Sequence, residues 1–323
     1  MQEFTFGMLT YNQEEYVFEH LESIRYQIEN YGKDVKTYFV LSDDASKDNT
    51  VKYVEDWIGN HKELFAGVTI VSKEKNEGIV PNYLMMLSNI HTQHYKILAG
   101  DDLYYKNNVF ELVRKGDFIL TPMICFDKEH IIQDKKRYNF KQLIMLQGRG
   151  CLKEYLIKRL KYSNCIDAPG TFINRKLIDN YLLQELKRYQ WIEDVPMWKY
   201  LLDKDGIEIK LLQEPYILYR SEVGISNNKN HSVRNRFEAD LKIIDRYIHT
   251  DKSKFPKIIN PYKYRYLIER EMMKFNHNKN SAVIQKFNAY ILQEEKNAEK
   301  YLSEIINGAR EWKSKYFSGD KID

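Results

Sequence analysis

Residues 96–105 read KILAGDDLYY, an apolar run followed by a glycine and two adjacent aspartates, Asp101 and Asp102. The apolar run has the length of a short buried strand, so the two carboxylates come where such a strand ends. Adjacent carboxylates repel each other, and removing them from water without partners costs free energy. The stretch therefore predicts a compensating charge beside the pair, with a divalent cation as the first candidate.

Three earlier apolar runs have the same character: FTFGMLTY (residues 4–11), TYFVLSD (37–43) and GVTIVSK (67–73). Apolar residues at helical spacing separate these runs, and Pro81 suits the first turn of a third helix after the last of them. Strands that alternate with helices in this order predict an α/β fold, a parallel sheet with helices on its faces.

Polar residues follow each of the four predicted strands. They are Thr10 to Asn12, Asp43 and Asp44, Lys73 to Gly78, and Asp101 and Asp102. In open α/β sheets ligands bind outside the carboxyl ends of the strands. We therefore expect these four clusters to meet along one edge of the sheet.

The later part of the sequence is mixed. It contains the strand-like DFILTPMICF (117–126), the helix-like CLKEYLIKRL (151–160) and the segment WIEDVPMWKYLL (191–202), and beyond Asn227 the pattern is helical. We predict three parts: residues 1–104 and 105–226 as two halves of one domain that face a common cleft, and 227–323 as a C-terminal helical extension.

Composition excludes several classes of protein. The chain has 323 residues, 43% of them hydrophobic, and a formal net charge of +4 from 50 Lys and Arg against 46 Asp and Glu, which gives no support for a nucleic-acid partner. No apolar run approaches the roughly 20 residues that span a bilayer, and there is no signal-peptide pattern, so we expect a cytoplasmic protein. Cys125, Cys151 and Cys165 are widely spaced and are expected to be buried free thiols.

Two acidic pairs at the sheet edge carry candidate chemistry. Asp43 or Asp44 can accept hydrogen bonds from a ribose or a base, as acidic residues at strand ends do, or one of them can cap the turn or the following helix. Asp101 and Asp102 offer hard oxygen ligands to Mg²⁺ or Mn²⁺, which takes its other ligands from water and a substrate diphosphate. The alternative for the second pair is ordinary turn residues. We favour the functional interpretation of both pairs.

A third acidic site lies in IEDVPMW (192–198), where Pro196 marks the first turn of a helix. The helix dipole holds a carboxylate there in its ionised form, which suits Asp194 to act as a base, although an ordinary N-cap aspartate has the same position. In YRSEVGISNN (219–228), predicted as a flexible loop, Arg220 and Ser226 can contact a diphosphate or can be solvated.

The absence of several motifs reduces the number of reaction classes that fit the sequence. The sequence has no GxGxxG, Walker lysine motif, Ser-His-Asp arrangement or metal-binding histidine pair, which argues against hydride transfer and P-loop phosphoryl transfer. A sugar-phosphate nucleotidylyltransferase needs a glycine-rich, basic turn after the first strand, and MLTYNQEE (8–15) is neither. A non-catalytic nucleotide-binding or scaffold protein is the alternative from another class.

Five motifs, in this order and spacing, resemble the family 2 glycosyltransferases of the GT-A fold. They are MLTYN (8–12), VLSDDASKDNT (40–50), KEKNEGIVPN (73–82), YKILAGDD (95–102) and IEDVPMW (192–198). Each motif is weak alone, but five in sequence over roughly residues 4–225 are fairly specific. The resemblance implies a Rossmann-like, mostly parallel sheet flanked by helices, whose first half binds a nucleotide sugar and whose second half binds the acceptor.

The resemblance also implies residue roles. Asp102 is the direct ligand of a divalent metal, Asp194 is the catalytic base, and the nucleotide-sugar site is formed by Thr10, Tyr11, Asp43, Asn76, Asp101, Arg220 and Ser226. Three positions depart from the family pattern and bear on the donor contacts. Leu9 replaces a usual proline, Ala99 the first aspartate of a longer acidic motif, and Pro81 a frequent arginine.

The activity implied is inverting, metal-dependent transfer of a sugar from a nucleotide-diphosphate sugar, with a UDP-sugar favoured. The acceptor is a hydroxyl of a glycan or lipid-linked glycan, in bacterial surface-polysaccharide (capsule) or glycan synthesis. One base suffices because the metal replaces the general acid that a glycosidase needs. The C-terminal helices fit three roles, between which the sequence does not choose: homo-oligomerisation, peripheral contact with the inner face of the membrane, and shaping of the acceptor site.

Overall fold

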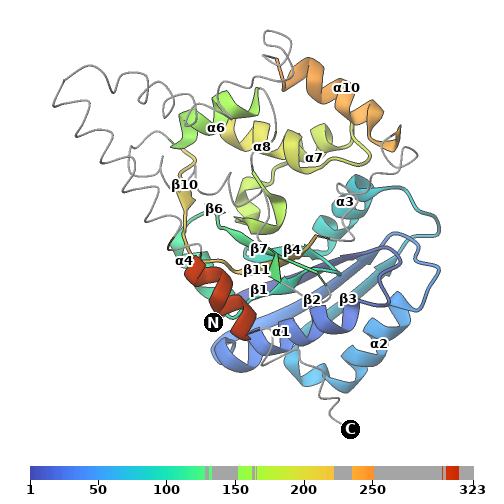
Figure 1. Cartoon of the computed structure of the whole chain (residues 1–323). Helices are drawn as coiled ribbons and strands as arrows, with labels where there is room; N and C mark the ends of the chain where they lie inside the picture. The colour runs from blue at the N-terminus through green and yellow to red at the C-terminus, as the bar shows by residue number, and fades with distance from the viewer. Residues whose placement is uncertain are drawn as a thin grey trace, which may run out of the picture.

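The computed structural model describes residues 1–127, 131–132, 152–161, 164, 166–221, 235–250, 300 and 303–312. At its centre is a four-stranded parallel sheet in the order β3-β2-β1-β4 (Figure 1). The strands are β1 (Gln2–Thr10), β2 (Val35–Asp43), β3 (Gly67–Ser72) and β4 (Tyr95–Ala99). The four predicted strands and their parallel pairing are confirmed.

Helices cover both faces of this sheet. On one face lie α1 (Val17–Tyr31) and α2 (Thr50–Asn60), and on the other lies α3 (Ile79–Asn89). Alternate side chains of β2 show the two layers, because Phe39 and Leu41 pack into the core that contains α1 and α2 and Val40 packs into the core that contains α3. With both faces buried, the strand ends are where polar side chains of this sheet can meet a ligand.

Residues 103–220 add two smaller sheets, in the orders β10-β6-β9 and β5-β11-β7-β8. Their strands are β5 (Leu103–Tyr104), β6 (Phe118–Leu120), β7 (Met123–Phe126), β8 (Ile131–Ile132), β9 (Thr171–Ile173), β10 (Ile209–Leu211) and β11 (Ile217–Arg220). The segment 117–126, predicted as strand-like, divides at Thr121 and Pro122 into strands of different sheets. A proline lacks the N–H that a continuous strand needs.

A layer of helices packs over α3. It comprises α6 (Leu152–Leu160), α7 (Asn180–Leu186) and α8 (Asp194–Asp203), with the short α4 (Leu112–Lys115) and 3₁₀ turns elsewhere at Lys62–Leu64, Val109–Glu111, Ala168–Gly170 and Arg175–Leu177. The apolar face of α8 is buried as its pattern predicted, with Trp198, Leu201 and Leu202 in the same core as Val80 and Met86 of α3. One core therefore joins the helix layer to the sheet.

The described parts of the C-terminal region are helical, as predicted: α10 (Glu238–Tyr247) and residues 303–312, drawn in red in Figure 1. The second helix packs back onto the domain, because Trp312 contacts Tyr26 and Tyr105 edge to face at 5.6 and 5.2 Å between ring centroids. Ile306 and Ala309 are buried in the same cluster. The rest of the predicted C-terminal extension lies outside the described residues.

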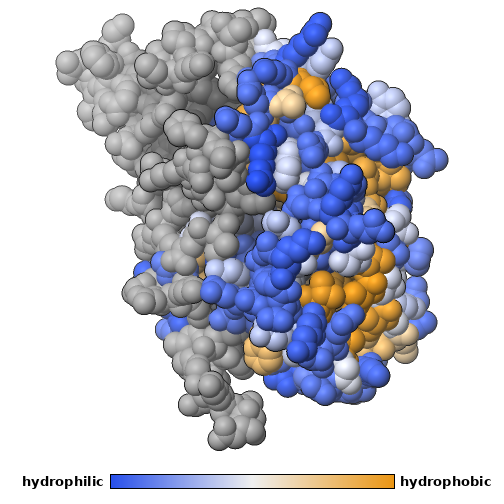
Figure 2. Space-filling view, turned by 90° about the vertical axis from the view of Figure 1, so that its right-hand side faces the viewer, coloured by the Kyte–Doolittle hydropathy of each residue, from blue (hydrophilic) through white to orange (hydrophobic). Residues whose placement is uncertain are grey.

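The exposed surface is mixed. Hydrophilic side chains dominate the side shown in Figure 2, with hydrophobic ones gathered in patches between them. Large exposed hydrophobic side chains come from several elements, among them Phe18 of α1, Tyr53 of α2 and Tyr181 of α7. Within the described part of the chain, no helix is both long enough and apolar enough to cross a bilayer. Cys125 is buried, whereas Cys151 and Cys165 lie outside the described residues.

Candidate active site

The carboxyl ends of the parallel strands meet at one edge of the sheet, as predicted. Thr10 at the end of β1 donates from Oγ1 to Asp43 Oδ1 at 2.7 Å, and Ser72 of β3 donates to Asp43 Oδ2 at 3.1 Å. Beyond β4, Asp101 Oδ1 accepts from Gln13 Nε2 at 3.0 Å, which ties the acidic turn to the loop after β1. The side chains of Thr10, Asp43 and Asp101 are all buried.

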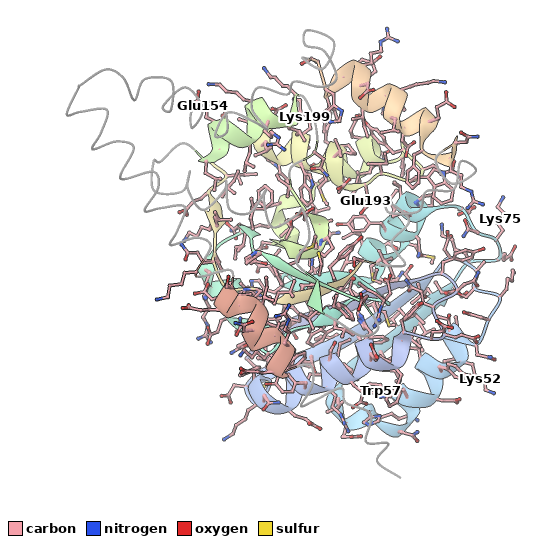
Figure 3. All side chains as sticks on the ribbon, viewed as in Figure 1. Lys52, Trp57, Lys75, Glu154, Glu193 and Lys199 are labelled. Carbon is pink, nitrogen blue, oxygen red and sulfur yellow. The ribbon has the colours of Figure 1, made fainter. Side chains whose placement is uncertain are left out.

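Asp44 fixes the loop between β3 and α3. Its two carboxylate oxygens accept from Glu77 N at 3.0 Å and Gly78 N at 2.9 Å. Asn76, predicted to line the donor site, lies on this loop and is exposed. Figure 3 shows the neighbouring Lys75 at the outer margin of the molecule, so this loop borders the edge of the sheet from outside. These contacts agree with the alternative interpretation of Asp44 from the sequence, in which it caps main-chain N–H groups.

Gly78 is required by the backbone at this point. Its φ is +103°, and a Cβ there would lie 2.6 Å from Gln190 O. We predict that Gly78→Ala lowers the free energy of unfolding by more than the about 1–2 kcal/mol of a left-handed alanine alone. Gly206→Ala is the matched control, since its φ is +73° but nothing lies within 4 Å of its added Cβ. Urea denaturation of both variants measures the difference, and equal losses would contradict the tight contact with Gln190.

Two loop residues carry left-handed backbone beside the strand ends, Asn12 with φ +50° and Ala45 with φ +64°. Asn12 Oδ1 accepts from Lys47 N at 2.8 Å, so the loops after β1 and β2 hold each other. Tyr11, predicted to contact the nucleotide, is 41% exposed at this edge. Its ring is therefore accessible to a ligand in a position that the two loops fix.

The acidic turn, Asp101 and Asp102, is buried and hydrogen-bonded to distant parts of the chain. Asp102 is 2% exposed, and its Oδ1 accepts from Arg220 N at 2.9 Å. Its carbonyl accepts from His20 Nδ1 at 2.7 Å, and burial lowers the pKa of His20 to about 4, so this imidazole is neutral at pH 7. Burial and then repulsion by Asp101 raise the pKa of Asp102 well above its ordinary value. The repulsion expected from the sequence is therefore present.

Part of the compensating charge comes from two buried cations. Lys96 is 4% exposed and donates to Thr171 O at 2.8 Å, and burial lowers its pKa to about 7. Arg220 is 2% exposed and donates from Nε to Asp101 O at 2.9 Å. Both cations lower the pKa of Asp102, but burial and Asp101 outweigh them. A further cation beside the two carboxylates would relieve the remaining repulsion.

The donor set fits a divalent cation of the hard type. Among the described residues no group of three or more His, Cys, Asp or Glu side chains is placed to hold a metal ion. Mg²⁺ and Mn²⁺ need fewer protein ligands when they bind with a diphosphate, because water and phosphate oxygens complete the shell. Asp101 and Asp102 supply carboxylate oxygens of that kind, one residue apart at the end of a strand.

Arg220 is not in a flexible loop, and that prediction is wrong. It is the last residue of β11, a strand buried along its whole length, and its guanidinium lies between the rings of Tyr16 at 4.6 Å and Phe126 at 4.4 Å. The guanidinium also pairs with Glu19. The apolar run that ends at Tyr219 is short, and the polar residues that follow it favour a loop. Contact of Arg220 with a diphosphate stays a prediction, and Ser226 lies outside the described residues.

Asp194 begins α8 in the second half of the domain. Its Oδ1 accepts from Val195 N at 2.7 Å and its Oδ2 from Asn164 Nδ2 at 2.8 Å, so the carboxylate is held at the helix N-terminus. Burial raises the pKa of Asp194 to about 6, and burial followed by the charge of Asp194 raises the pKa of Glu193 to about 8. Both pKa values are raised towards neutral pH, which makes the Asp194 carboxylate a stronger base than an exposed aspartate.

This pair predicts a pH dependence of stability. The pKa of Glu193 rises from 4.5 to about 8 on folding, so its contribution to stability is complete below pH 4.5 and is lost as pH rises through about 8. Glu193→Gln should remove this decline, and its melting temperature should rise relative to that of the native protein across the window. Glu208→Gln, at an exposed position, is the control and should show no such trend. Parallel curves for Glu193→Gln and the native protein would contradict the raised pKa.

The segment before Asp194 contacts the loop between β3 and α3 and the start of α3. Gln190 O accepts from Val80 N at 3.0 Å, and Gln190 Nε2 donates to Glu77 O at 3.1 Å. Figure 3 places Glu193 between α3 and the helix layer, and its side chain is half-buried. The two halves of the domain are therefore linked next to the candidate base, although Asp194 and the acidic turn lie far apart in sequence.

Sequence reasoning missed the residues that support the acidic turn. They are His20, which binds the Asp102 carbonyl, Gln13, which binds the Asp101 carboxylate, and Lys96, which binds Thr171 O nearby. The sequence pattern around each of them indicates only a helix, a loop or a strand. His20 and Lys96 did carry a signal, because both are polar residues at positions of α1 and β4 that the periodicity turns towards the core.

The parallel sheet with helices on both faces and acidic residues at its strand ends is the arrangement expected of the GT-A fold. The model of the family described as Glycosyl transferase family 2 matches residues 5–182. This match covers more than half of the chain, and the chain belongs to the family 2 glycosyltransferases.

The solved structure that matches with a TM-score of 0.50 supports the fold. Residues 1–349 of TarS from S. aureus, in complex with UDP-GlcNAc, are 16% identical with a TM-score of 0.50, over 100% of this chain and 93% of that one. The mannosyltransferase PcManGT from Pyrobaculum calidifontis, in complex with GDP-Man and Mn²⁺, is 15% identical with a TM-score of 0.46, over 91% of this chain and 73% of that one. A search of the curated proteins finds no match.

Proposed function

We propose that this glycosyltransferase moves a sugar from a nucleotide-diphosphate sugar, with a UDP-sugar favoured, to a hydroxyl of a glycan or lipid-linked glycan. The observation that carries the proposal is the pair of carboxylate sites: the buried acidic turn after β4 and Asp194 at the N-terminus of α8, where Gln190 ties the preceding segment to the loop between β3 and α3. TarS carries UDP-GlcNAc in its crystal structure, which motivates the preference for UDP.

In the proposed donor site, the nucleotide lies along the edge formed by the ends of β1, β2 and β3. Tyr11 and Asn76 are exposed there and offer a ring and an amide to the base and ribose. Thr10 and Asp43 are buried and bonded to each other, and Asp43 also accepts from Ser46 and Ser72, so their proposed part in nucleotide binding is to hold the edge that the ribose contacts. Arg220 and Ser226 are the proposed diphosphate contacts.

A divalent cation, when bound, would stabilise the negative charge of the departing diphosphate as a Lewis acid. Asp102 is its proposed direct ligand, through the carboxylate oxygen that the Arg220 amide does not use, with Asp101 beside it. The Arg220 amide, the His20 imidazole and the Gln13 amide hold the two aspartates in place before any ligand arrives. Such preorganisation avoids rearrangement during the reaction.

Asp194 is the proposed base. It takes the proton of the acceptor hydroxyl, and the oxygen attacks the anomeric carbon as the bond from that carbon to the diphosphate breaks. The nucleoside diphosphate leaves with the bonding electron pair, so a single displacement inverts the anomeric configuration. The bonds from Val195 and Asn164 aim the carboxylate and leave it acceptor capacity for the hydroxyl.

The stereochemistry of the product tests this mechanism. NMR of the product formed from an α-linked UDP-sugar should show a β linkage, accompanied by an equal amount of UDP. Retention of the α linkage would contradict a single displacement on Asp194. The wider setting, surface-polysaccharide synthesis at the cytoplasmic face of the membrane with peripheral contact or self-association through the C-terminal helices, stays a prediction.

A further inference from the structure

A buried carboxylate from the C-terminal region binds the segment that leads into the candidate base. Asp240, on α10, is 2% exposed. Its carboxylate accepts from three consecutive main-chain amides, Gln190 N at 3.0 Å, Trp191 N at 2.6 Å and Ile192 N at 3.0 Å. Hydrogen bonds from three successive N–H groups to one charged acceptor fix the conformation of a short segment strongly.

Aromatic contacts reinforce this attachment. The ring of Trp191 meets that of Phe237 at 6.1 Å, and the guanidinium of Arg236 lies 5.6 Å from the Trp191 ring. All three partners of the segment, Arg236, Phe237 and Asp240, come from the first turns of α10 or the residues just before it. The start of α10 is therefore attached specifically to residues 190–192.

The attached segment lies directly before Asp194 and contacts the loop between β3 and α3. Asp194 follows Ile192 by two residues and is the first residue of α8. On its other side the segment contacts the loop between β3 and α3 and the first turn of α3. Val80 N donates to Gln190 O, and Gly78 has no room for a Cβ beside that oxygen. Asp44 also binds this loop, by accepting hydrogen bonds from Glu77 N and Gly78 N. A shift of residues 190–192 would therefore move the base and the border of the donor site together.

We propose that Asp240 is a positioning residue: by binding residues 190–192 it sets the place of Asp194 relative to the donor site. The inference rests on the proposed function, in which Asp194 is the base. It gives the start of the C-terminal region a definite part in catalysis, without contact with substrate. Misplacement of a reacting group by about 1 Å can cost about 10²-fold in rate, so a loosened segment should show first in turnover.

Four variants of the full chain test the proposal, three at Asp240 and one control. Asp240→Asn keeps the size of the side chain and one acceptor oxygen, whereas Asp240→Ala leaves three amides without their partner. Asp245→Asn, on the same helix and half exposed beside His249, is the matched control. For each variant, kcat and KM are measured for donor and acceptor, together with hydrogen exchange at the amides of residues 190–192.

The expected result is graded. Asp240→Asn should lower kcat about 10-fold and Asp240→Ala about 100-fold, with the KM of the donor changed less than about 2-fold, and exchange at residues 190–192 should speed up in the same order. Asp240→Glu should recover part of the loss, since it restores the charge. Asp245→Asn should match the native protein in both readouts.

Two results would overturn the proposal: faster exchange at residues 190–192 with native turnover, or reduced turnover with native exchange at these amides. Exchange is read independently of activity. If the native protein transfers no sugar, the proposed function fails, and slow native exchange that quickens in Asp240→Asn would still establish the attachment. Native exchange in both Asp240 variants would reject the attachment whatever the activity.

Discussion

Asp194→Asn is expected to lower the turnover of sugar transfer by about 10²- to 10⁴-fold, the contribution typical of a positioned general base. Asparagine keeps an oxygen that can accept from Val195 N, so the fold at the start of α8 should survive. The KM for the donor should change little, because Asp194 belongs to the acceptor side. Steady-state kinetics with native protein and variant measure the effect.

The pH profile adds a second readout of the same residue. Burial raises the pKa of Asp194 to about 6, so native turnover should fall as pH drops through that value, because a protonated carboxyl cannot take the acceptor proton. Asp203→Asn, at the exposed end of the same helix, is the control and should keep both the rate and the profile. Native turnover in Asp194→Asn would show that another group is the base.

The second large effect is expected at the acidic turn. A ligand at 100 times its Kd stabilises the native state by about 2.7 kcal/mol, and for UDP this gain should depend on Mn²⁺. Asp102→Asn should abolish the dependence on Mn²⁺, since it removes the proposed ligand but keeps an acceptor for Arg220 N. Thermal unfolding with UDP, with Mn²⁺ and with both measures the effect.

The variant Asp101→Asn distinguishes the roles of the two carboxylates in metal binding. Asp101 is bonded to Gln13, and with Asp102 as the direct ligand its variant should keep a weakened Mn²⁺ response. The contacts of Asp102 with Arg220 and His20 also suit a residue that ties the turn to β11 and α1. If Asp101→Asn loses the response while Asp102→Asn only lowers the melting temperature without ligand, the metal ligand is Asp101.

The sheet and its edge could be predicted from the sequence because the information is local. Each of β1 to β4 is an apolar run that ends in polar residues, and parallel strands carry their ends to the same side. Thr10 and Asp43 therefore meet although 33 residues separate them. The start of α8 at Asp194 followed equally from Pro196 and the apolar spacing behind it.

The support of the site could not be predicted, because it depends on contacts between distant segments without periodic signal. Arg220 reaches Asp102 across 118 residues, and Asp240 reaches Gln190 across 50. A single polar residue inside a strand or helix pattern shows that something must satisfy it, but not which partner does so. For the same reason Arg220 was assigned to a loop, since its burial depends on Tyr16 and Phe126.

Release of nucleoside diphosphate is the most direct test of the central claim, that this chain is a metal-dependent nucleotide-sugar transferase. The native protein would be incubated with UDP-, dTDP- and GDP-sugars in turn, with Mn²⁺ and a mixture of glycan acceptors. We predict release from one nucleotide class, UDP first, that stops when the metal is chelated and is lost in Asp194→Asn. Tight, metal-dependent nucleotide binding without release from any donor would contradict the claim and identify a binding protein that retains the fold.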